Sequence, residues 1–241
     1  VKMPRWDLQK LKSSDHHIGS EMKSVGEVMA LGRSFPEALQ KAVRMLNIGA
    51  NGVSAHPHDL ADPMDEVAHP TDRRLFAVYE ALKQGVTTEE IHAASHIDRW
   101  FLDHIAAIFE TEQYIRATPM SAAVLLRAKR MGFSDRVIAE LTGKTEAAIR
   151  RNRLKHGITP VMKQIDTLAG EFDAETNYLY ATYHGAVHDV ESLGKTTAVV
   201  LGSGPYAIGS SVEFDWSAVN TAKTLHKNGY QTIIVNSNPE T

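Results

Sequence analysis

The sequence predicts a mainly α-helical fold followed by the first β-α-β unit of an α/β domain. Residues 34–157 hold one amphipathic segment after another, with Ser or Thr at many of their starts and Gly near their ends. An apolar run at 197–201 then leads into a glycine-rich turn. A helical pattern at 213–228 and a second apolar run at 231–236 complete the order strand, helix, strand.

Composition is that of an ordinary globular chain, and it excludes several classes of function. The 241 residues suit one large domain or two small ones, with 43% hydrophobic and 23% charged residues. A formal net charge of -3 gives no overall basic footprint for nucleic acid. Cysteine is absent, so disulfides and thiolate metal sites are excluded. No apolar run approaches the about 18 residues of a membrane span.

The N-terminal part is expected to be irregular up to residue 20 and helical across 21–31. In the second stretch Met22, Val25 and Met29 recur at helical spacing. A firmer helix start follows at Ser34, because Ser34 caps the helix and Glu37 completes a capping box. The buried face of that helix is expected to consist of Leu39, Ala42, Val43 and Leu46.

The centre of the chain is predicted to be a loop followed by a series of helices. Residues 47–70 carry three prolines and no sustained period, which predicts a long surface loop. Helices are expected at 71–84, 87–94, 97–115, 121–131, 134–141 and 145–155. The longest of these has an apolar face of Trp100, Phe101, Ile105, Ile108 and Phe109. A short strand is expected within 177–185.

The glycine-rich turn resembles the turns that bind phosphates. Gly202, Gly204 and Ala207 satisfy the pattern G-x-G-x-x-G/A of dinucleotide sites, in which the backbone approaches a pyrophosphate. Pro205 removes one amide donor, and the second strand is followed by Asn236 where a ribose-binding acid is expected. Gly209 further delays the start of the helix. An NAD-binding oxidoreductase is therefore one interpretation, favoured by the pattern and weakened by its context.

Acidic residues follow the two predicted strands. In a parallel pair the carboxyl ends of both strands meet at one edge of the sheet, where ligands bind. Glu213 and Glu240 are expected to line one cavity at that edge. The alternative is that Glu213 and Asp215 only stabilise the first turn of their helix through its dipole.

Residues 134–157 resemble a DNA-binding helix-turn-helix motif. Ala139, Gly143 and Ile149 occupy the small, turn and inward-facing positions of that motif. The second helix carries cations that could bind DNA phosphates. Two observations weaken this interpretation: cations also suit a helix C-terminus, and Glu146, at the end that would contact the bases, would face phosphates unfavourably. The cations are Arg150, Arg151, Arg153 and Lys155.

The histidines do not predict a metal site or a catalytic set. His56 and His58, with Asp59 and Asp62, have metal-ligand chemistry, but Pro57 separates the two histidines in a loop without rigid support. We therefore expect no metal, and no catalytic residue within this chain.

Several long motifs, in order and at similar separations, are similar to those of one enzyme family. These motifs are MKSVGEVM at 22–29, IDRWFL at 97–102, VMKQIDTL at 161–168, TNYLY at 176–180, LGSGPYAIGSSVEFD at 201–215 and NSNPET at 236–241. With them the chain resembles the large subunit of carbamoyl-phosphate synthetase along its whole length.

The resemblance implies a domain organisation. Residues 1–33 correspond to the tail of the first ATP-grasp synthetase half, and 34–190 to the helical oligomerisation domain. Residues 195–241 correspond to the start of the pre-ATP-grasp α/β domain of the second half. The chain is expected to be a fragment of this subunit.

The resemblance also implies an activity for the parent protein. The parent would be an ATP-dependent ligase that makes carbamoyl phosphate from bicarbonate, ammonia released from glutamine, and two ATP, for arginine or pyrimidine synthesis. It would use Mg or Mn and K with ATP, none of which is expected on this piece. Carbamate would pass between the halves through an internal tunnel lined by Glu213, Glu240 and Ser211.

Partners and location follow from the same resemblance. We expect self-association through the helical domain, and a glutaminase small subunit or fused glutaminase domain in the parent. No nucleic acid or membrane partner is expected. The expected location is cytoplasmic, or mitochondrial for a eukaryotic arginine or urea-cycle parent. This piece alone is expected to lack synthetase activity.

Overall fold

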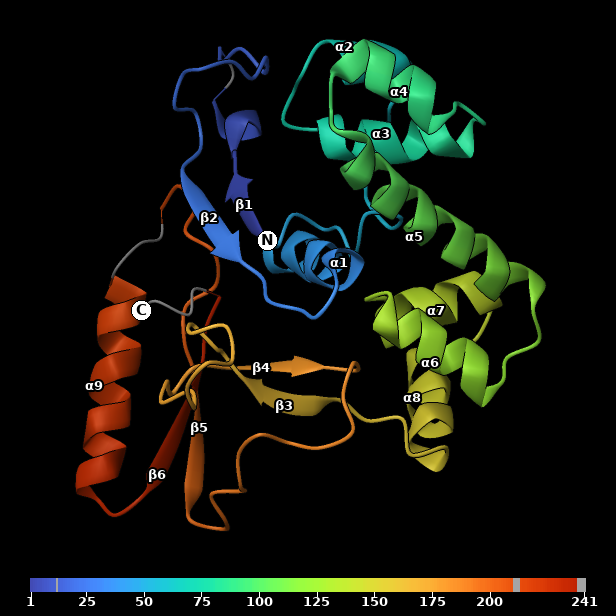
Figure 1. The fold of residues 1–241 in the computed structure, drawn as a ribbon. Coiled ribbons are helices and arrows are strands. Elements are labelled where there is room, and N and C mark those ends of the chain that lie inside the picture. The colour runs from blue at the N-terminus through green and yellow to red at the C-terminus, as the bar shows by residue number, and fades with distance from the viewer. Residues whose placement is uncertain (12, 210–212, 238–241) are drawn as a thin grey trace.

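A computed structural model describes residues 1–11, 13–209 and 213–237 of the chain. Most of the regular structure is helical, and the strands form two-stranded sheets that lie beside the helices (Figure 1). The helical region occupies one side of the molecule, with the N-terminal hairpin and the C-terminal β-α-β unit on the other. Within the described residues, none of the helices has the length and apolar character needed to span a bilayer.

The first element is a β-hairpin rather than an irregular segment and a helix. Strand β1 (Lys2–Arg5) pairs antiparallel with β2 (Gly26–Met29), and the short 3-10 helix η1 (Leu8–Lys10) lies between them in sequence. The predicted helix at 21–31 is therefore wrong. Met22 lies before the strand and is 92% exposed. Within β2, Glu27 is exposed and Val28 is fully buried, because successive side chains of a strand point to opposite faces.

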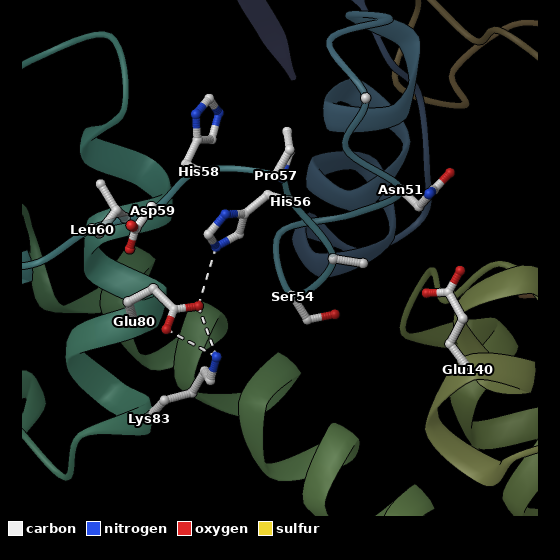
Figure 2. A pocket seen from close by; sticks show the side chains of 12 residues that line it. Asn51, Ser54, His56, Pro57, His58, Asp59, Leu60, Glu80, Lys83 and Glu140 are labelled. Atoms are coloured by element: carbon white, nitrogen blue, oxygen red, sulfur yellow. Dashed lines mark hydrogen bonds and ion pairs between the residues drawn. The ribbon is translucent and has the colours of Figure 1, made fainter.

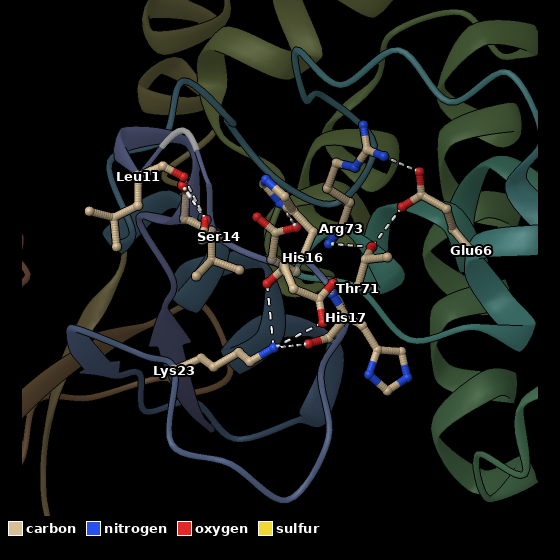
Figure 3. Close-up of polar contacts among 11 residues, drawn as sticks. Leu11, Ser14, His16, His17, Lys23, Glu66, Thr71 and Arg73 are labelled. Carbon is tan, nitrogen blue, oxygen red and sulfur yellow. Dashed lines mark hydrogen bonds and ion pairs between the residues drawn. The ribbon is translucent and has the colours of Figure 1, made fainter.

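The segment between the two strands contacts the helical region (Figure 3). The backbone N–H of Ile18 donates to the carbonyl of Pro70 at 2.7 Å, and His17 forms an antiparallel bridge with Thr71. The ring Nδ1 of His16 lies 3.1 Å from the Asp72 carboxylate. The N-terminal segment is thus attached to the start of the helical bundle.

Helix α1 (Phe35–Met45) begins at Ser34, as predicted, and its four expected apolar residues are buried. Ser34 accepts the N–H of Glu37, but the Glu37 carboxylate accepts the N–H of Arg33, so the capping box is only half formed. The Glu37 side chain is buried, and donors compensate its charge there. Its carboxylate accepts hydrogen bonds from the Lys41 ammonium at 2.7 Å and from the Thr182 hydroxyl at 3.0 Å.

The remaining helices form the bundle. Part of the predicted loop at 47–70 is helical, because Asp62 caps a short helix with Pro63 in its first turn. Glycines 85, 132, 143 and 157 have positive φ at or just after helix ends, as the sequence predicts. The helices are α2 (Pro63–Ala68), α3 (Arg74–Lys83), α4 (Thr88–Ser95), α5 (Arg99–Ala117), α6 (Ala122–Arg130), α7 (Asp135–Thr142) and α8 (Glu146–Lys155).

One continuous core unites these helices. Its largest buried side chains include Tyr79 on α3, whose hydroxyl donates to the Glu112 carboxylate on α5 at 2.6 Å. The apolar face predicted for α5 is only partly buried. Ile105 and Ile108 lie in the core, whereas Trp100 and Phe101 are about half exposed and pack on Phe35.

A second antiparallel hairpin follows the bundle. Strand β3 (Val161–Gln164), which the sequence analysis did not identify, pairs with β4 (Leu179–Thr182), which lies inside the strand predicted at 177–185. Tyr183, just after β4, lies over the cations Lys129 and Arg153. These cations flank the buried Asp135 carboxylate at 2.8 and 2.7 Å, and so the hairpin packs on a buried cluster of paired charges.

The C-terminal unit has the predicted order strand, helix, strand. Strands β5 (Thr197–Leu201) and β6 (Gln231–Val235) are parallel, and helix α9 (Glu213–Lys227) connects them. The register pairs Val199 with Ile233 and Val200 with Ile234, which confirms that the two apolar runs are neighbouring strands. Their apolar side chains remain largely uncovered, and Leu201 is 81% exposed.

Candidate functional site at the edge of the parallel strands

The carboxyl ends of β5 and β6 meet at one edge, as the sequence predicts. The N–H of Gly202 donates to the carbonyl of Val235 at 2.8 Å, and the N–H of Ser237 donates to the carbonyl of Ser203 at 3.1 Å. A Cβ on Gly202 would lie 3.0 Å from the Asn236 side chain and 3.1 Å from the Val235 carbonyl. Glycine at 202 therefore allows the turn to cross close to the second strand.

A hydrogen-bond network fixes the glycine turn, here residues 202–209, to α9. The hydroxyl of Ser203 lies 2.6 Å from Asp215 Oδ1 and 2.8 Å from Asn236 Oδ1, and the hydroxyl of Tyr206 donates to Asp215 Oδ2. Asp215, in the first turn of α9, is thus the common acceptor. Its side chain does more than complement the helix dipole.

The charge of Asp215 suits this role. Desolvation raises the pKa of its carboxyl, but the donors Ser203, Tyr206 and Asn236 outweigh it, and the pKa is lowered overall. The bond to Asp215 is also the main reason that the pKa of Tyr206 is raised. Both groups are therefore held in the states that the hydrogen bond requires, an anionic acceptor and a protonated donor.

The N-terminal segment contacts the same turn. Asp7 Oδ2 accepts the backbone N–H of Ile208 at 3.1 Å, and Lys10 Nζ lies 3.3 Å from the Ile208 carbonyl. On strand β2, Gly26 packs directly against the backbone of Tyr206. Sequence analysis missed these contacts, since nothing local to Asp7 or Gly26 marks a partner about 200 positions away.

The predicted site residues are only partly described. Glu213 is the first residue of α9 and is exposed, and it is Asp215 that joins this first turn to the sheet edge. Of the glycines, Gly204 has open space around it and Gly209 has φ +93. Ser211 and Glu240 lie outside the described residues, so the expected meeting of Glu213 and Glu240 stays a prediction.

The histidines singled out in the sequence line a separate cavity of about 520 Å³ (Figure 2). The rings of His56 and His58 both pack on Phe76, with ring centroids 4.7 and 4.6 Å away. His56 Nε2 lies 3.2 Å from the Glu80 carboxylate. No group of three or more His, Asp or Glu within the described parts of the chain is arranged to hold a metal ion.

Helices α7 and α8 pack as the helix-turn-helix pattern predicts, but one of the supposed phosphate-binding cations is buried. Ala139 and Ile149 are buried, and Gly143 makes the turn at φ +64. Arg153 is buried against Asp135 at 2.7 Å, so this cation stabilises the bundle.

Fold and site together define a helical domain joined to the opening unit of an α/β domain, with its candidate site at the sheet edge. Two family models match this order. Residues 27–157 match the carbamoyl-phosphate synthetase large chain, oligomerisation domain, and residues 194–241 match the carbamoyl phosphate synthase preATP-grasp domain. The chain belongs to the carbamoyl-phosphate synthetase large-chain family.

Similar proteins cover the whole chain. It is 48% identical to the multifunctional protein pyr-3 of Neurospora crassa, 47% to the carbamoyl phosphate synthase large chain of Methanothermobacter thermautotrophicus, and 47% to the mitochondrial arginine-specific large chain of Schizosaccharomyces pombe. The matches include 100% of this chain but only 13%, 22% and 21% of those relatives. The chain thus spans between about an eighth and a fifth of their length.

These findings do not support the two other interpretations of function. The oligomerisation-domain match includes both helices of the helix-turn-helix pattern, and the preATP-grasp match includes the glycine turn. Neither a DNA-binding protein nor an NAD-dependent oxidoreductase is among the families matched. In the second case the structure adds that Asn236, at the position of a ribose-binding acid, is bonded to Asp215 and Ser203.

Proposed function

We propose that this chain works as part of a carbamoyl-phosphate synthetase large chain. In this role the whole protein is an ATP-dependent ligase that makes carbamoyl phosphate from bicarbonate, ammonia from glutamine, and two ATP. The observation that carries the proposal is the order of the two family matches along one chain. The parallel β5–β6 pair supports it, because a pre-ATP-grasp α/β domain requires such an opening unit.

Each part of the chain is assigned a role. Residues 1–33 belong to the end of the first synthetase half, 34–190 form the helical scaffold and oligomerisation domain, and 195–241 open the second half. The uncovered apolar side chains of β5 and β6 support the last assignment, since a longer α/β domain would bury them.

The sheet edge is assigned to the passage that carries carbamate between the halves. Glu213, Glu240 and Ser211 are its proposed lining, with carboxylates as acceptors for the migrating species and small side chains as spacers. The glycine turn, with Gly202, Gly204 and Gly209, shapes the wall. The exposed position of Glu213 at the start of α9 supports this assignment.

The full protein would need further groups and partners. ATP with Mg or Mn, and K, would bind outside this chain, as would a glutaminase subunit or fused glutaminase domain. We place the protein in the cytoplasm, or in the mitochondrion for an arginine-specific eukaryotic form. The relatives include both a multifunctional protein and a mitochondrial large chain.

The activity can be tested with the full-length protein that contains this chain. Purified full-length protein should form carbamoyl phosphate from bicarbonate and ATP, with ammonia or glutamine as nitrogen donor. The 241-residue chain alone should form none. Product from the isolated chain, or none from the full protein with its glutaminase, would contradict the proposal.

The passage needs a separate test. In the full-length protein, Glu213→Gln should lower the carbamoyl phosphate formed per ATP consumed, because intermediate is lost on the way. Glu146→Gln is the matched control, since Glu146 is also the exposed first residue of a helix. An unchanged ratio in Glu213→Gln would remove Glu213 from the passage.

A further inference from the structure

The glycine turn is held from outside the β-α-β unit by the N-terminal segment. Asp7 Oδ2 accepts the N–H of Ile208 at 3.1 Å, across 201 positions of sequence. Lys10 Nζ bridges the same two residues, at 3.2 Å from Asp7 Oδ2 and 3.3 Å from the Ile208 carbonyl. Both backbone polar groups of Ile208 are therefore engaged by the N-terminal segment.

Asp7 is built into its own segment firmly enough to serve as an anchor. Its side chain is completely buried, and Oδ1 accepts Arg5 Nε at 2.9 Å. Arg5 in turn donates through Nη1 to the carbonyl of Leu46, next to α1, at 2.6 Å. Burial raises the pKa of the Asp7 carboxyl, but the hydrogen bonds from Arg5, Ile208 and Lys10 together lower it by more. The pKa is therefore lowered overall, and the anion is favoured.

Gly26 supplies a second, steric contact with the turn. A Cβ at residue 26 would lie 2.1 Å from the carbonyl oxygen and 2.7 Å from the carbonyl carbon of Tyr206. These are backbone atoms, so no side-chain rotation can relieve the overlap. Only glycine lets β2 approach the turn this closely.

We propose that Asp7 and Gly26 are positioning residues that set the shape of the glycine turn from the first synthetase half. The turn is then held on one side by this segment and on the other by Asp215 of α9. Because the same turn borders the proposed passage, the end of one half would control the wall through which its product leaves. This last consequence rests on the proposed function.

Hydrogen exchange at the Ile208 amide tests the Asp7 contact in the 241-residue chain. Asn has one acceptor oxygen where Asp has two, so Asp7→Asn cannot serve both Arg5 Nε and the Ile208 N–H. We expect exchange of the Ile208 amide to accelerate about tenfold or more. Asp15→Asn, an exposed change of the same charge in the same segment, should leave it unchanged.

Gly26→Ala tests the steric contact in the same way. It should also accelerate exchange at Ile208, because the turn must shift away from β2. Gly204→Ala is the matched control: a Cβ at 204 meets nothing within 4 Å. Unchanged exchange of Ile208 in both Asp7→Asn and Gly26→Ala would overturn the proposal.

Amides in α5 report whether each variant still folds. If Asp7→Asn or Gly26→Ala also exposes α5, the parent chain decides, because the bond to Asp7 should protect the Ile208 amide from exchange. A protected Ile208 amide in the parent chain then supports the proposal, and one that exchanges as fast as an unstructured chain overturns it.

The full-length protein separates this inference from the proposed function. Where Asp7→Asn loosens the turn and also lowers carbamoyl phosphate formed per ATP consumed, both stand. Where the turn loosens but that ratio holds, the Asp7 and Gly26 contacts stand and the passage assignment falls.

Discussion

At the residue scale, the fold depends on a few buried polar side chains that form hydrogen bonds with one another. Tyr79 and Glu112 form one such pair, in which Arg116 binds the second carboxylate oxygen of Glu112 at 2.9 Å. Burial, followed by the charge of Glu112, raises the pKa of Tyr79, which keeps the hydroxyl protonated as a donor. The pair joins α3 to α5 through the middle of the core.

Removing the donor of this pair should destabilise the bundle. Tyr79→Phe leaves Glu112 Oε2 buried without its hydrogen bond, and we expect unfolding to become easier by about 1–3 kcal/mol. Urea unfolding followed by circular dichroism measures the change. Tyr230→Phe, at an exposed position, serves as control. A Tyr79→Phe variant as stable as the parent would show that the hydrogen bond contributes nothing net.

The two histidines of the cavity predict a pH dependence. Burial lowers the pKa of both His56 and His58; for His56 it outweighs the opposing charge of Glu80, while Lys83 acts in the same direction as burial. The unfolded chain therefore binds more protons than the folded one just below a pH of about 6.5, and stability must fall as pH decreases through that value.

Replacing His56 should reduce this loss. His56→Gln cannot take up the proton, so its stability should decline less between roughly pH 7 and pH 5 than that of the parent. Thermal unfolding across that range measures the slope. His226→Gln, on the exposed surface of α9, is the control. Equal slopes for parent and His56→Gln would contradict the assignment.

At the scale of elements, local capping signals predicted most helices, but pairing between distant segments was hidden. Helix α4 begins where the sequence predicts the helix at 87–94, and the structure adds a capping box between Thr87 and Glu90. The helix predicted at 21–31 is a strand because residues 26–29 pair with 2–5, and a spacing of three or four over so few residues does not distinguish the two. Strand β3 has the same difficulty, since its partner begins 18 positions after its first residue.

For the candidate site too, local patterns could be predicted from the sequence, whereas contacts between distant segments could not. Two apolar runs around a helical pattern sufficed to predict the parallel strands and their common edge. The contacts of Asp7 and Gly26 with the turn had no local signal, because a buried carboxylate and a close backbone approach are visible only once the chain has folded.

The packing of α7 and α8 rests on the Asp135 charge cluster. Asp135→Ala would leave Lys129 and Arg153 buried side by side without their anion. We expect a loss of about 3–5 kcal/mol in unfolding free energy. Glu140→Ala, which breaks an exposed pair with Arg136 in the same helix, should cost under about 1 kcal/mol. Similar losses for the two variants would refute the cluster's special role.

At the scale of the whole molecule, the helical domain leaves an apolar surface uncovered. Trp100 and Phe101 at the start of α5 are exposed by 50% and 43%, and their rings lie 5.2 and 5.4 Å from Phe35. An aromatic cluster of this kind at the surface indicates an interaction site. It lies within the region that matches the oligomerisation-domain model.

Self-association should therefore depend on this cluster. We expect the chain to form oligomers between micromolar and millimolar concentrations in sedimentation experiments, and Trp100→Ser with Phe101→Ser to weaken them at least tenfold. Trp216→Ser is the matched control, because Trp216 is 71% exposed but lies on α9, outside the helical domain. A chain that stays monomeric throughout this range would refute self-association. Oligomers weakened only by Trp216→Ser would instead place the contact on the uncovered β-α-β unit, whose apolar surface is then the one that associates.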